Sequence, residues 1–445
     1  MKDVYEKTIL ILNDFERSRK PLRTIFYSIT SNISSIENRR AIFHYVVEVV
    51  RRINTIDFIL LKLTRGNFKN MNTTLKNTLR LLTFLLKWET YSDSSSKHRT
   101  LSSFTEYIKD KSQYDLIKPY EEKIKNFNLE RALKKHSTTK KLSYQYYYPE
   151  WIVSELLKVM PYSEVEALLS YTSKKRITWI RVNTLKTTVE GALKSLKNEG
   201  IEVKVDTDYP IALMVKRSKV PISLSKTFKS GMVTIQDKAS MVTVFALNPL
   251  PGETIWDSCA APAMKTTLIS QLMNNTGIVI ATDYSLKRSI KAIENINLLG
   301  VSNVSWFIAN AETFSIKLDI EKVLIDAPCS STGVFQSDPD FKWRVTPRKL
   351  RSFITLQRRL LKGILNNIKN DVIVVYSTCS ILPQEGEEQI IWLKNEFGKK
   401  IELAPPDIIG EHGYSKYEIS EYIKRTFPHI HKTKGFFISK FIYHP

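Results

Sequence analysis

The feature that most restricts the fold of this chain is a regular alternation of two kinds of segment from Thr254 onward. Short apolar runs, ETIWD, GIVIATD, VSWFIA, KVLID and VIVVYS, are separated by stretches long enough to form helices. This alternation is typical of βαβ units on a mostly parallel sheet. We therefore expect an α/β core whose ligands bind at the carboxyl ends of the strands.

The chain before this core contains different patterns. Apolar residues at helical spacing predict amphipathic helices near the N-terminus, as in Phe43, Val46, Val47 and Val50 and in Leu75, Leu79, Leu82 and Leu86. The polar segment from Tyr91 to Ser103 is expected to be a loop, and the Lys- and Glu-rich stretch from Lys118 to Lys141 a linker.

Strand-like and helical pieces alternate between Pro149 and Gly231, for example in ITWIRVN and IALMV, which predicts a small α+β unit. We therefore expect a helical domain at residues 1–130, a linker with a small α+β subdomain at 131–235, and the α/β domain at 236–445.

The charge of the chain indicates a polyanionic partner. Its 445 residues contain 67 Lys and Arg against 45 Asp and Glu, a formal net charge of +22. Such an excess is typical of nucleic-acid-binding proteins, although a generally Lys-rich proteome would also produce it. The start MKDVYEKTILIL lacks a signal-peptide pattern, and no apolar run approaches the length of a membrane span. We expect a cytoplasmic protein, a monomer, without contact to a membrane.

Small residues follow the first strand of the predicted core. Asp257 leads into Ser258 and then CAAPAMKT, where a ligand can approach the backbone and the free N–H groups of a helix start. Asp283 ends the second strand, 26 positions after Asp257, roughly where doubly wound folds place an acid that holds a ribose diol. Asp283 as a helix N-cap is the alternative.

The fourth and fifth strands each deliver a cysteine to the same edge of the sheet. The fourth ends in Asp326, Ala327, Pro328 and Cys329, and the fifth in Ser377, Thr378 and Cys379. A buried cysteine is usually an inert small apolar residue, but two at neighbouring strand ends favour a catalytic role. With Cys259 they are the only cysteines, and their spacing matches neither a zinc site nor a disulfide framework, so we expect reduced thiols and no metal.

A thiol suits one reaction in particular. Cytosine C5 becomes nucleophilic after a thiolate adds to C6, and it then accepts a methyl group from a sulfonium donor. Asp326 is expected to supply a hydrogen bond at N3 if burial raises its pKa.

At this point the residues resemble the Nop2/Sun (RsmB-like) RNA 5-methylcytosine methyltransferases. The resemblance begins near Leu142, Pro149, Glu150 and Trp151 and continues through Arg181, Val182, Asn183, Gln236, Asp237, Ala239 and Ser240. It includes CAAPAMKT, DAPCSSTG, DPDFKW, STCS, PQEGEE and GFF, in the order of the family. It implies a Rossmann-like S-adenosylmethionine-dependent methyltransferase core behind a small RNA-recognition-like subdomain.

The resemblance also implies roles for individual residues. Cys379 would be the nucleophile and Cys329 would aid product release, whereas DNA cytosine methyltransferases use the cysteine of their PC motif. Lys265 would lie near the target base, which adds it to Asp326 among the expected catalytic residues. The cofactor would contact Cys259, Ala260, Ala261, Pro262, Ala263, Met264, Lys265, Asp283, Asn310 and Asp326.

The N-terminal part resembles the NusB-like helical domain that precedes the bacterial rRNA enzyme of this family. This resemblance rests on the pattern ENRRAIFHYVVEVVRR, from Glu37 to Arg52. It implies extra basic surface for structured RNA and favours rRNA over tRNA as the substrate, with the target base taken out of its stack.

Two departures from the family pattern leave an alternative open. Ala263 stands where glycine is usual, and Asn310 stands where an aspartate commonly meets the adenine of the cofactor. We expect weaker cofactor binding, not its loss. The alternative is a catalytically weak relative that serves as an RNA-binding ribosome assembly factor. A small-molecule methyltransferase would explain neither the paired cysteines nor the charge.

Overall fold

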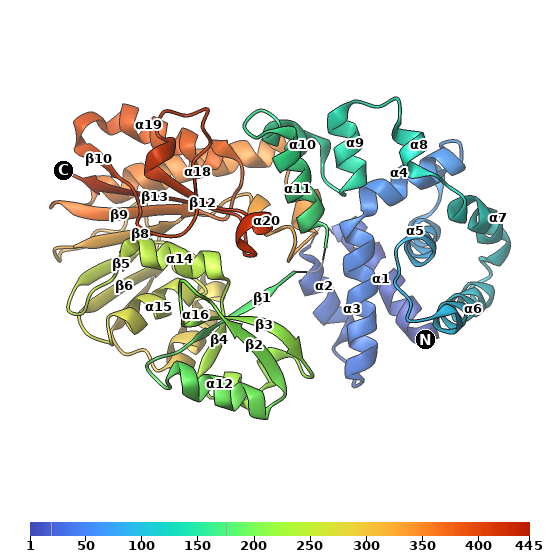
Figure 1. Ribbon diagram of the computed structural model, residues 1–445, viewed down its shortest axis with the longest axis horizontal. Helices are drawn as coiled ribbons and strands as arrows, with labels where there is room; N and C mark the ends of the chain where they lie inside the picture. The colour runs from blue at the N-terminus through green and yellow to red at the C-terminus, as the bar shows by residue number, and fades with distance from the viewer. Residues whose placement is uncertain (19, 175) are drawn as a thin grey trace. The chain divides into compact units, whose positions relative to one another are not determined.

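The computed structural model describes residues 1–18, 20–174 and 176–445, which form two compact units (Figure 1). One unit, here called the helical unit, comprises Met1–Lys158 and the segment Asp338–Arg344. The other, here called the catalytic unit, comprises Val159–Ser337 and Val345–Pro445. The helical unit thus contains a segment from the middle of the α/β sequence.

The helical unit is built around an apolar core that includes Val46, Val50, Leu79 and Leu82, so the predicted stripes are confirmed. Its helices are α1 (Lys2–Ser18), α2 (Leu22–Thr30), α3 (Ile36–Arg51), α4 (Ile53–Leu63), α5 (Thr73–Lys87), α6 (Ser94–Asp110), α7 (Tyr114–Lys125), α8 (Leu129–Leu133), α9 (Thr138–Gln145), α10 (Glu150–Leu156) and α17 (Phe341–Arg344). Across the described ranges, no helix is long and apolar enough to cross a membrane.

The loop predicted from Tyr91 to Ser103 is wrong, because most of it belongs to α6. Asp93 caps this helix by accepting from the Ser96 backbone N–H, and the Ser96 hydroxyl forms the reciprocal contact with the Asp93 backbone. This capping box gives a polar segment a helical start. The stretch from Lys118 to Lys141 is also largely helical, in α7, α8 and α9. The domain boundary at residue 130 stays a prediction.

The catalytic unit begins with a small antiparallel sheet in the order β2-β3-β1-β4. Its strands are β1 (Thr178–Val182), β2 (Ile201–Val205), β3 (Ala212–Ser218) and β4 (Val233–Ile235), and the accompanying helices are α11 (Tyr162–Thr172), α12 (Val189–Asn198) and α13 (Lys226–Lys229). Strands β1 and β3 contain the predicted segments ITWIRVN and IALMV. The expected small α+β subdomain is therefore confirmed.

The larger sheet has the strand order β11-β12-β13-β9-β8-β5-β6-β7, with β10 paired to β13. Its strands are β5 (Thr254–Asp257), β6 (Ile278–Asp283), β7 (Val304–Ile308), β8 (Lys322–Asp326), β9 (Val372–Thr378), β10 (Ile401–Ala404), β11 (Glu411–His412), β12 (Ile423–Thr426) and β13 (Phe436–Tyr443). Strands β5 to β9 pair in parallel, and β13 pairs with β9 in the antiparallel direction. The predicted strands from β5 to β9 and the Rossmann-like core are confirmed.

Helices cover both faces of this sheet (Figure 1). They are α14 (Lys238–Leu247), α15 (Met264–Leu272), α16 (Leu286–Leu299), α18 (Pro347–Asn366) and α19 (Glu387–Phe397), and the short helix α20 (Pro428–His431) precedes β13. Alternation along the strands divides the core: Trp256 and Val374 pack with α18 and α19, whereas Ile255 and Val375 pack with α14. Chain order reverses between β5 and β8, and ligands of doubly wound sheets bind at this point.

Candidate active site

The carboxyl ends of β8 and β9 bring together the residues expected to carry the chemistry. Asp326 and Ser377 are paired positions of the two strands, and the Ser377 hydroxyl donates to Asp326 Oδ1 over 2.9 Å. Cys329 and Cys379 follow on the two strand ends, and their sulfur atoms lie 3.2 Å apart. Both cysteines are partly exposed. The parallel register therefore joins two thiols that are 50 positions apart in the chain.

The surroundings of the two sulfur atoms differ, and this difference separates their ionisation. The hydrogen bond between the thiols lowers the pKa of Cys379 against the effect of burial, and the Ser331 hydroxyl and the positive charge of Lys434 add to the lowering. The same hydrogen bond, burial and the negative charge of Glu385 raise the pKa of Cys329. Cys379 is thus the thiol that ionises first, with Cys329 as the S–H donor to its thiolate.

Cys259 lies in a different environment. Burial raises the pKa of its thiol, and the carboxylates of Asp257 and Asp326 raise it further. A protonated thiol is a poor nucleophile, so the geometry leaves Cys259 without a nucleophilic role.

Lys265 and Asp326 form an ion pair beside the two reactive thiols. Lys265 Nζ lies 2.5 Å from Asp326 Oδ2, and the Lys265 side chain is only 11% exposed. Burial alone would lower the pKa of Lys265, but the Asp326 carboxylate raises it above its usual value. Lys265 and Asp326 thus form a close ion pair, and the expected hydrogen bond from Asp326 to N3 of the base stays a prediction.

A pocket of about 250 Å³ lies between the first loop and Asp326. Its lining contains most of the predicted cofactor residues, namely Cys259, Ala260, Ala261, Pro262, Met264, Lys265 and Asp326, together with Asp257. Asp257 is 1% exposed, and within residues 1–18, 20–174 and 176–445 its Oδ1 atom has no hydrogen-bond partner. An unpaired buried carboxylate oxygen fits the ammonium group of an amino-acid-bearing cofactor.

Asp283 and Asn310 are absent from this lining, and both make local hydrogen bonds. Asp283 Oδ2 accepts from the Ala261 backbone N–H over 3.2 Å and lies 3.1 Å from Arg288 Nη1. Asn310 is exposed, and its Oδ1 accepts from the Glu312 backbone N–H over 3.1 Å. Contacts of either residue with the cofactor stay a prediction.

Arg288 is a residue that sequence reasoning missed. It pairs with Asp283 and also donates from Nη2 to the Ala261 carbonyl oxygen, so it holds both sides of the first loop. The signal in the sequence was weak, since Arg288 is one of several basic residues in α16 and only its position five residues after Asp283 distinguishes it.

Ala263 stands where the family usually has glycine, and its backbone adopts the left-handed conformation that glycine favours. Its φ is +71° and its ψ is +18°, and it is the N-cap of α15. A non-glycine residue in this region is strained by roughly 1–2 kcal/mol. The turn is formed here by an alanine that is fully buried.

Arg181, a motif residue of the small subdomain, supports the start of α15. Arg181 is fully buried, and it donates to Gln236 Oε1 over 2.6 Å, to the Met264 carbonyl oxygen over 2.9 Å and to Thr267 Oγ1 over 3.0 Å. Burial lowers the pKa of Arg181 to about 9. These contacts fix the first turn of α15, on which Lys265 stands.

The PQEGEE motif supports the loop that carries Cys329. Glu385 Oε1 accepts from the Ser330 backbone N–H over 2.8 Å and from Gln357 Nε2 over 3.1 Å. Further along, Glu387 and Arg425 form an ion pair whose side chains are both 0% exposed. These carboxylates stabilise the structure around the thiols and do not line the pocket.

The DPDFKW motif lies in the helical unit. Asp338 pairs with Arg23 over 2.8 Å, and Trp343 Nε1 donates to the Val50 carbonyl oxygen over 2.6 Å. Lys342 is fully buried, and its Nζ donates to the Tyr147 carbonyl oxygen over 3.0 Å. The motif thus anchors a segment of the α/β sequence among helices.

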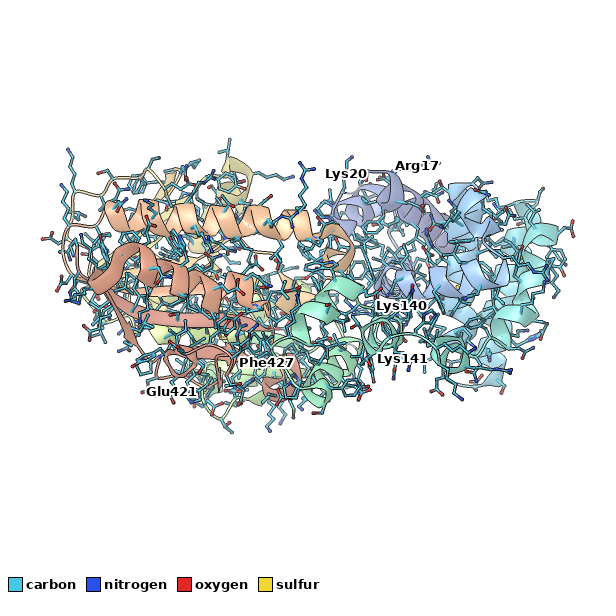
Figure 2. The ribbon with its side chains drawn as sticks, turned by 90° about the horizontal axis from the view of Figure 1, so that it is seen from above. Arg17, Lys20, Lys140, Lys141, Glu421 and Phe427 are labelled. Carbon is cyan, nitrogen blue, oxygen red and sulfur yellow. The ribbon has the colours of Figure 1, made fainter. Side chains whose placement is uncertain are left out.

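Lys140 and Lys141 lie on α9 and are labelled in Figure 2. Four tyrosines follow them in the sequence: Tyr144, Tyr146, Tyr147 and Tyr148. Both lysines are partly exposed, whereas Tyr148 is buried and Tyr144 stacks on Phe58 at a centroid distance of 4.4 Å. The tyrosines therefore pack within the helical unit.

In the part of the chain that is described, no group of His, Cys, Asp and Glu could hold a metal ion.

Two family models match the chain in order. The model described as "Methyltr_RsmF/B-like, ferredoxin-like domain" matches residues 148–223, and the model described as "16S rRNA methyltransferase RsmB/F" matches residues 244–442. The first covers strands β1 to β3 of the small subdomain, and the second covers most of the larger sheet.

Curated relatives carry related names. A Caenorhabditis elegans protein, "26S rRNA (cytosine-C(5))-methyltransferase nsun-1", is 32% identical over 68% of this chain and 47% of its own length. A Synechocystis protein, "Probable ribosomal RNA small subunit methyltransferase B", is 30% identical over 67% of each chain. The chain thus spans about half the length of the animal relative that it matches.

Solved structures agree on the fold. The crystal structure of PH0851 covers 98% of both chains with a TM-score of 0.78 at 24% identity. A methyltransferase homologue from Pyrococcus horikoshii covers 69% of this chain and 99% of its own, with a TM-score of 0.61 at 28% identity. The NusB-like identity of the helical unit stays a prediction.

Both domain models match in order, and the Synechocystis relative aligns over two thirds of both chains. The chain therefore belongs to the RsmB/F (Nop2/Sun) methyltransferase family, whose methyl donor is S-adenosylmethionine.

Proposed function

We propose that this chain methylates C5 of a cytosine in RNA through a covalent adduct between Cys379 and C6 of the base. The observation that carries the proposal is the 3.2 Å contact between Cys379 Sγ and Cys329 Sγ, beside the Lys265–Asp326 pair. The names of the relatives support rRNA over tRNA as the substrate.

The first step is the addition of the Cys379 thiolate to C6. Electron density moves through the ring to N3, where the ammonium group of Lys265 donates a hydrogen bond or its proton. Asp326 orients Lys265 and balances its charge, and Ser377 holds Asp326 in turn. C5 is now electron-rich, and bound S-adenosylmethionine would supply its methyl group to C5 by cleavage of the S–CH3 bond, with S-adenosylhomocysteine as the leaving group.

The second step releases the product. A base removes the proton from C5, the C5–C6 double bond forms again, and the sulfur of Cys379 leaves C6. The Cys329 thiol stays protonated at 3.2 Å from this sulfur, so it donates to the departing thiolate. Without Cys329, departure is slower than addition, and the adduct accumulates.

The pocket lined by the first loop would hold the cofactor. The free Oδ1 atom of Asp257 would pair with its ammonium group, and the first turn of α15 would face its carboxylate. Arg288 and Asp283 would fix the loop on the opposite side.

Cysteine variants test this mechanism. Cys329→Ala, incubated with RNA and S-adenosylmethionine, is expected to accumulate a protein–RNA adduct on a denaturing gel, and Cys379→Ala is expected to form none. Cys259→Ala changes the pocket lining but keeps both thiols of the 3.2 Å contact, so it is the matched control and should accumulate no adduct. An adduct with Cys379→Ala but not with Cys329→Ala would exchange the two roles.

The alternative of a weakly active assembly factor rests on Ala263 and Asn310. The Asn310 side-chain oxygen is engaged by a backbone N–H, and Ala263 is strained. Binding of labelled S-adenosylmethionine separates the two functions, because the absence of binding at millimolar cofactor would refute the enzyme and leave the assembly factor.

A further inference from the structure

A second pocket lies in the catalytic unit, outside the site described above. It is open to solvent, has a volume of about 430 Å³ that includes part of this open space, and is lined by residues from β1, β2, the turn after β2, β3 and the end of α20. The lining residues are Trp179, Met214, Lys204, Val205, Asp206, Thr207, His431 and Lys432. Nothing in the proposed reaction uses it.

The walls of this pocket are held in place by buried contacts. Trp179 is 5% exposed, and its indole N–H donates to the Lys432 carbonyl oxygen over 2.9 Å. Lys238 lies behind, with Nζ 2.6 Å from Asp206 Oδ2 and 5.6 Å from the centre of a Trp179 ring. Asp206 Oδ1 also accepts from the Tyr209 backbone N–H over 3.0 Å. The cavity therefore exists before any ligand enters it.

The lining combines apolar side chains, neutral and cationic donors, and one carboxylate, Asp206, which is paired with Lys238. Trp179, Met214 and Val205 form the apolar part of the lining, with Trp179 5% and Met214 9% exposed. Burial lowers the pKa of His431, and its Nδ1 accepts from the backbone N–H of Phe427, labelled in Figure 2, so Nε2 carries the hydrogen of the neutral ring and lies 3.7 Å from Glu411 Oε1. Lys204 and Lys432 are exposed at the mouth. This lining suits a nucleotide, because the apolar side chains can contact its base and the two ammonium groups can pair with its phosphate.

The pocket is connected to the nucleophile by a short piece of backbone. Lys432 lines the pocket, and three residues later the Gly435 backbone N–H donates to the Gly333 carbonyl oxygen over 2.9 Å. The Gly333 N–H in turn donates to the Cys379 carbonyl oxygen over 3.0 Å. Three residues span at most about 11 Å of chain.

Asp237 fixes the course of this backbone piece. Its Oδ1 accepts from Thr433 Oγ1 over 2.6 Å and from the Lys434 backbone N–H over 3.1 Å. The next side chain, Lys434, is the one whose charge lowers the pKa of Cys379. A strand of RNA that places one base at Cys379 therefore passes within reach of the pocket.

We propose that this pocket binds an unstacked nucleotide of the substrate RNA within three positions of the target cytosine. The inference rests on the proposed function, because that function makes RNA the strand that is bound. The reason to expect a second bound base is the pocket itself. It makes the RNA sequence beside the target part of what the enzyme recognises.

Crosslinking tests the proposal directly. The probe is a single-stranded RNA of nine nucleotides with one central cytosine and 4-thiouridine placed in turn at each flanking position. After irradiation, one or two positions within three nucleotides of the cytosine are expected to crosslink to peptides containing residues 204–207 or 431–432. A map in which no position reaches either peptide, or a probe that does not bind, would overturn the proposal.

A variant that fills the pocket adds a second readout. Thr207 is exposed, so Thr207→Trp occupies space without removing core contacts. It should weaken probe binding by at least about 5-fold, as the loss of one stacked base does. Thr184→Trp, at an exposed threonine of the same subdomain outside the lining, is the matched control. Equal affinity of the two variants would refute a bound base.

Methyl transfer to the same probe separates the two proposals. Crosslinks to the pocket without methyl transfer would remove the proposed activity and leave an RNA pocket. Methyl transfer without crosslinks at residues 204–207 or 431–432 would keep the activity and remove the pocket.

Discussion

Replacing Asp257 by asparagine should stabilise the protein at high pH and weaken its cofactor binding. Asp257 is 1% exposed, its Oδ2 accepts from Thr266 Oγ1 over 2.7 Å, and its Oδ1 is unpaired among the described residues. Burial raises the pKa of Asp257 to about 7, from an ordinary value of 3.8. The protein therefore carries a carboxylate that is costly to ionise.

The sign of the pH effect follows from this raised pKa. The cost of folding with Asp257 is absent below the unfolded pKa, grows as the pH rises from about 4 to about 7, and is constant above that. At 1.36 kcal/mol per pKa unit, the two pKa values correspond to a cost of about 2 kcal/mol at pH 5 and about 4 kcal/mol at pH 8. The stabilisation by Asp257→Asn should thus be roughly 2–3 kcal/mol larger at pH 8 than at pH 5.

Urea unfolding of both proteins without cofactor, at the two pH values, measures this difference. The comparison cancels the penalty of the new asparagine N–H group, which has no partner at either pH. Asp319→Asn is the control, because Asp319 is exposed. The same stability difference at pH 5 and pH 8 would refute the reasoning.

Calorimetry with S-adenosylhomocysteine measures the functional side. If Asp257 pairs with the ammonium group, Asp257→Asn should weaken binding at pH 8 by about 10-fold or more, the usual value of a hydrogen bond to a charged group. Unchanged affinity would show that the free oxygen does not face the cofactor.

Three further substitutions test individual contacts. Arg425→Met leaves Glu387 charged and buried, so the free energy of unfolding in urea should fall by about 3–5 kcal/mol; a loss below about 1 kcal/mol would contradict a buried pair. In Gly333→Ala the new Cβ would lie 1.9 Å from the Gly435 carbonyl oxygen, so the backbone beside the thiols must move. The rate of methyl transfer should therefore fall more than 10-fold, and an unchanged rate would contradict this. Ala263→Gly relieves a strained φ of +71° but removes a buried methyl group, so its unfolding free energy should change by less than about 1 kcal/mol, and a larger change in either direction would contradict this balance.

Much of the larger sheet could be predicted because its signals are local. Each strand from β5 to β9 is a short apolar run, and periodicity along the chain is sufficient to identify it. Polar or reactive residues at the ends of these runs, such as Asp326 and Cys379, were therefore expected at one edge. Parallel register then brought Asp326 beside Ser377, as the order of a doubly wound sheet requires.

Other features were hidden from local reasoning. Helix α6 is polar and half-exposed, so its composition resembled a loop, and its capping box became visible only in the structure. The segment from Asp338 to Arg344 follows the Cys329 loop in sequence but packs in the helical unit through contacts with residues some 300 positions away. Contacts between residues so far apart in the chain produce no periodic pattern in the sequence.

By itself the sequence determined the parallel core, the two thiols and the acid that meet at its edge, and the small subdomain in front. Only the tertiary structure decided which groups are charged. Cys379 ionises before Cys329 because the hydrogen bond between the thiols stabilises the Cys379 thiolate, and because Ser331 and Lys434 act on this sulfur and Glu385 on the other. The ionisation of a side chain depends on its burial and on charges within a few ångströms, and the fold brings those charges from distant parts of the chain.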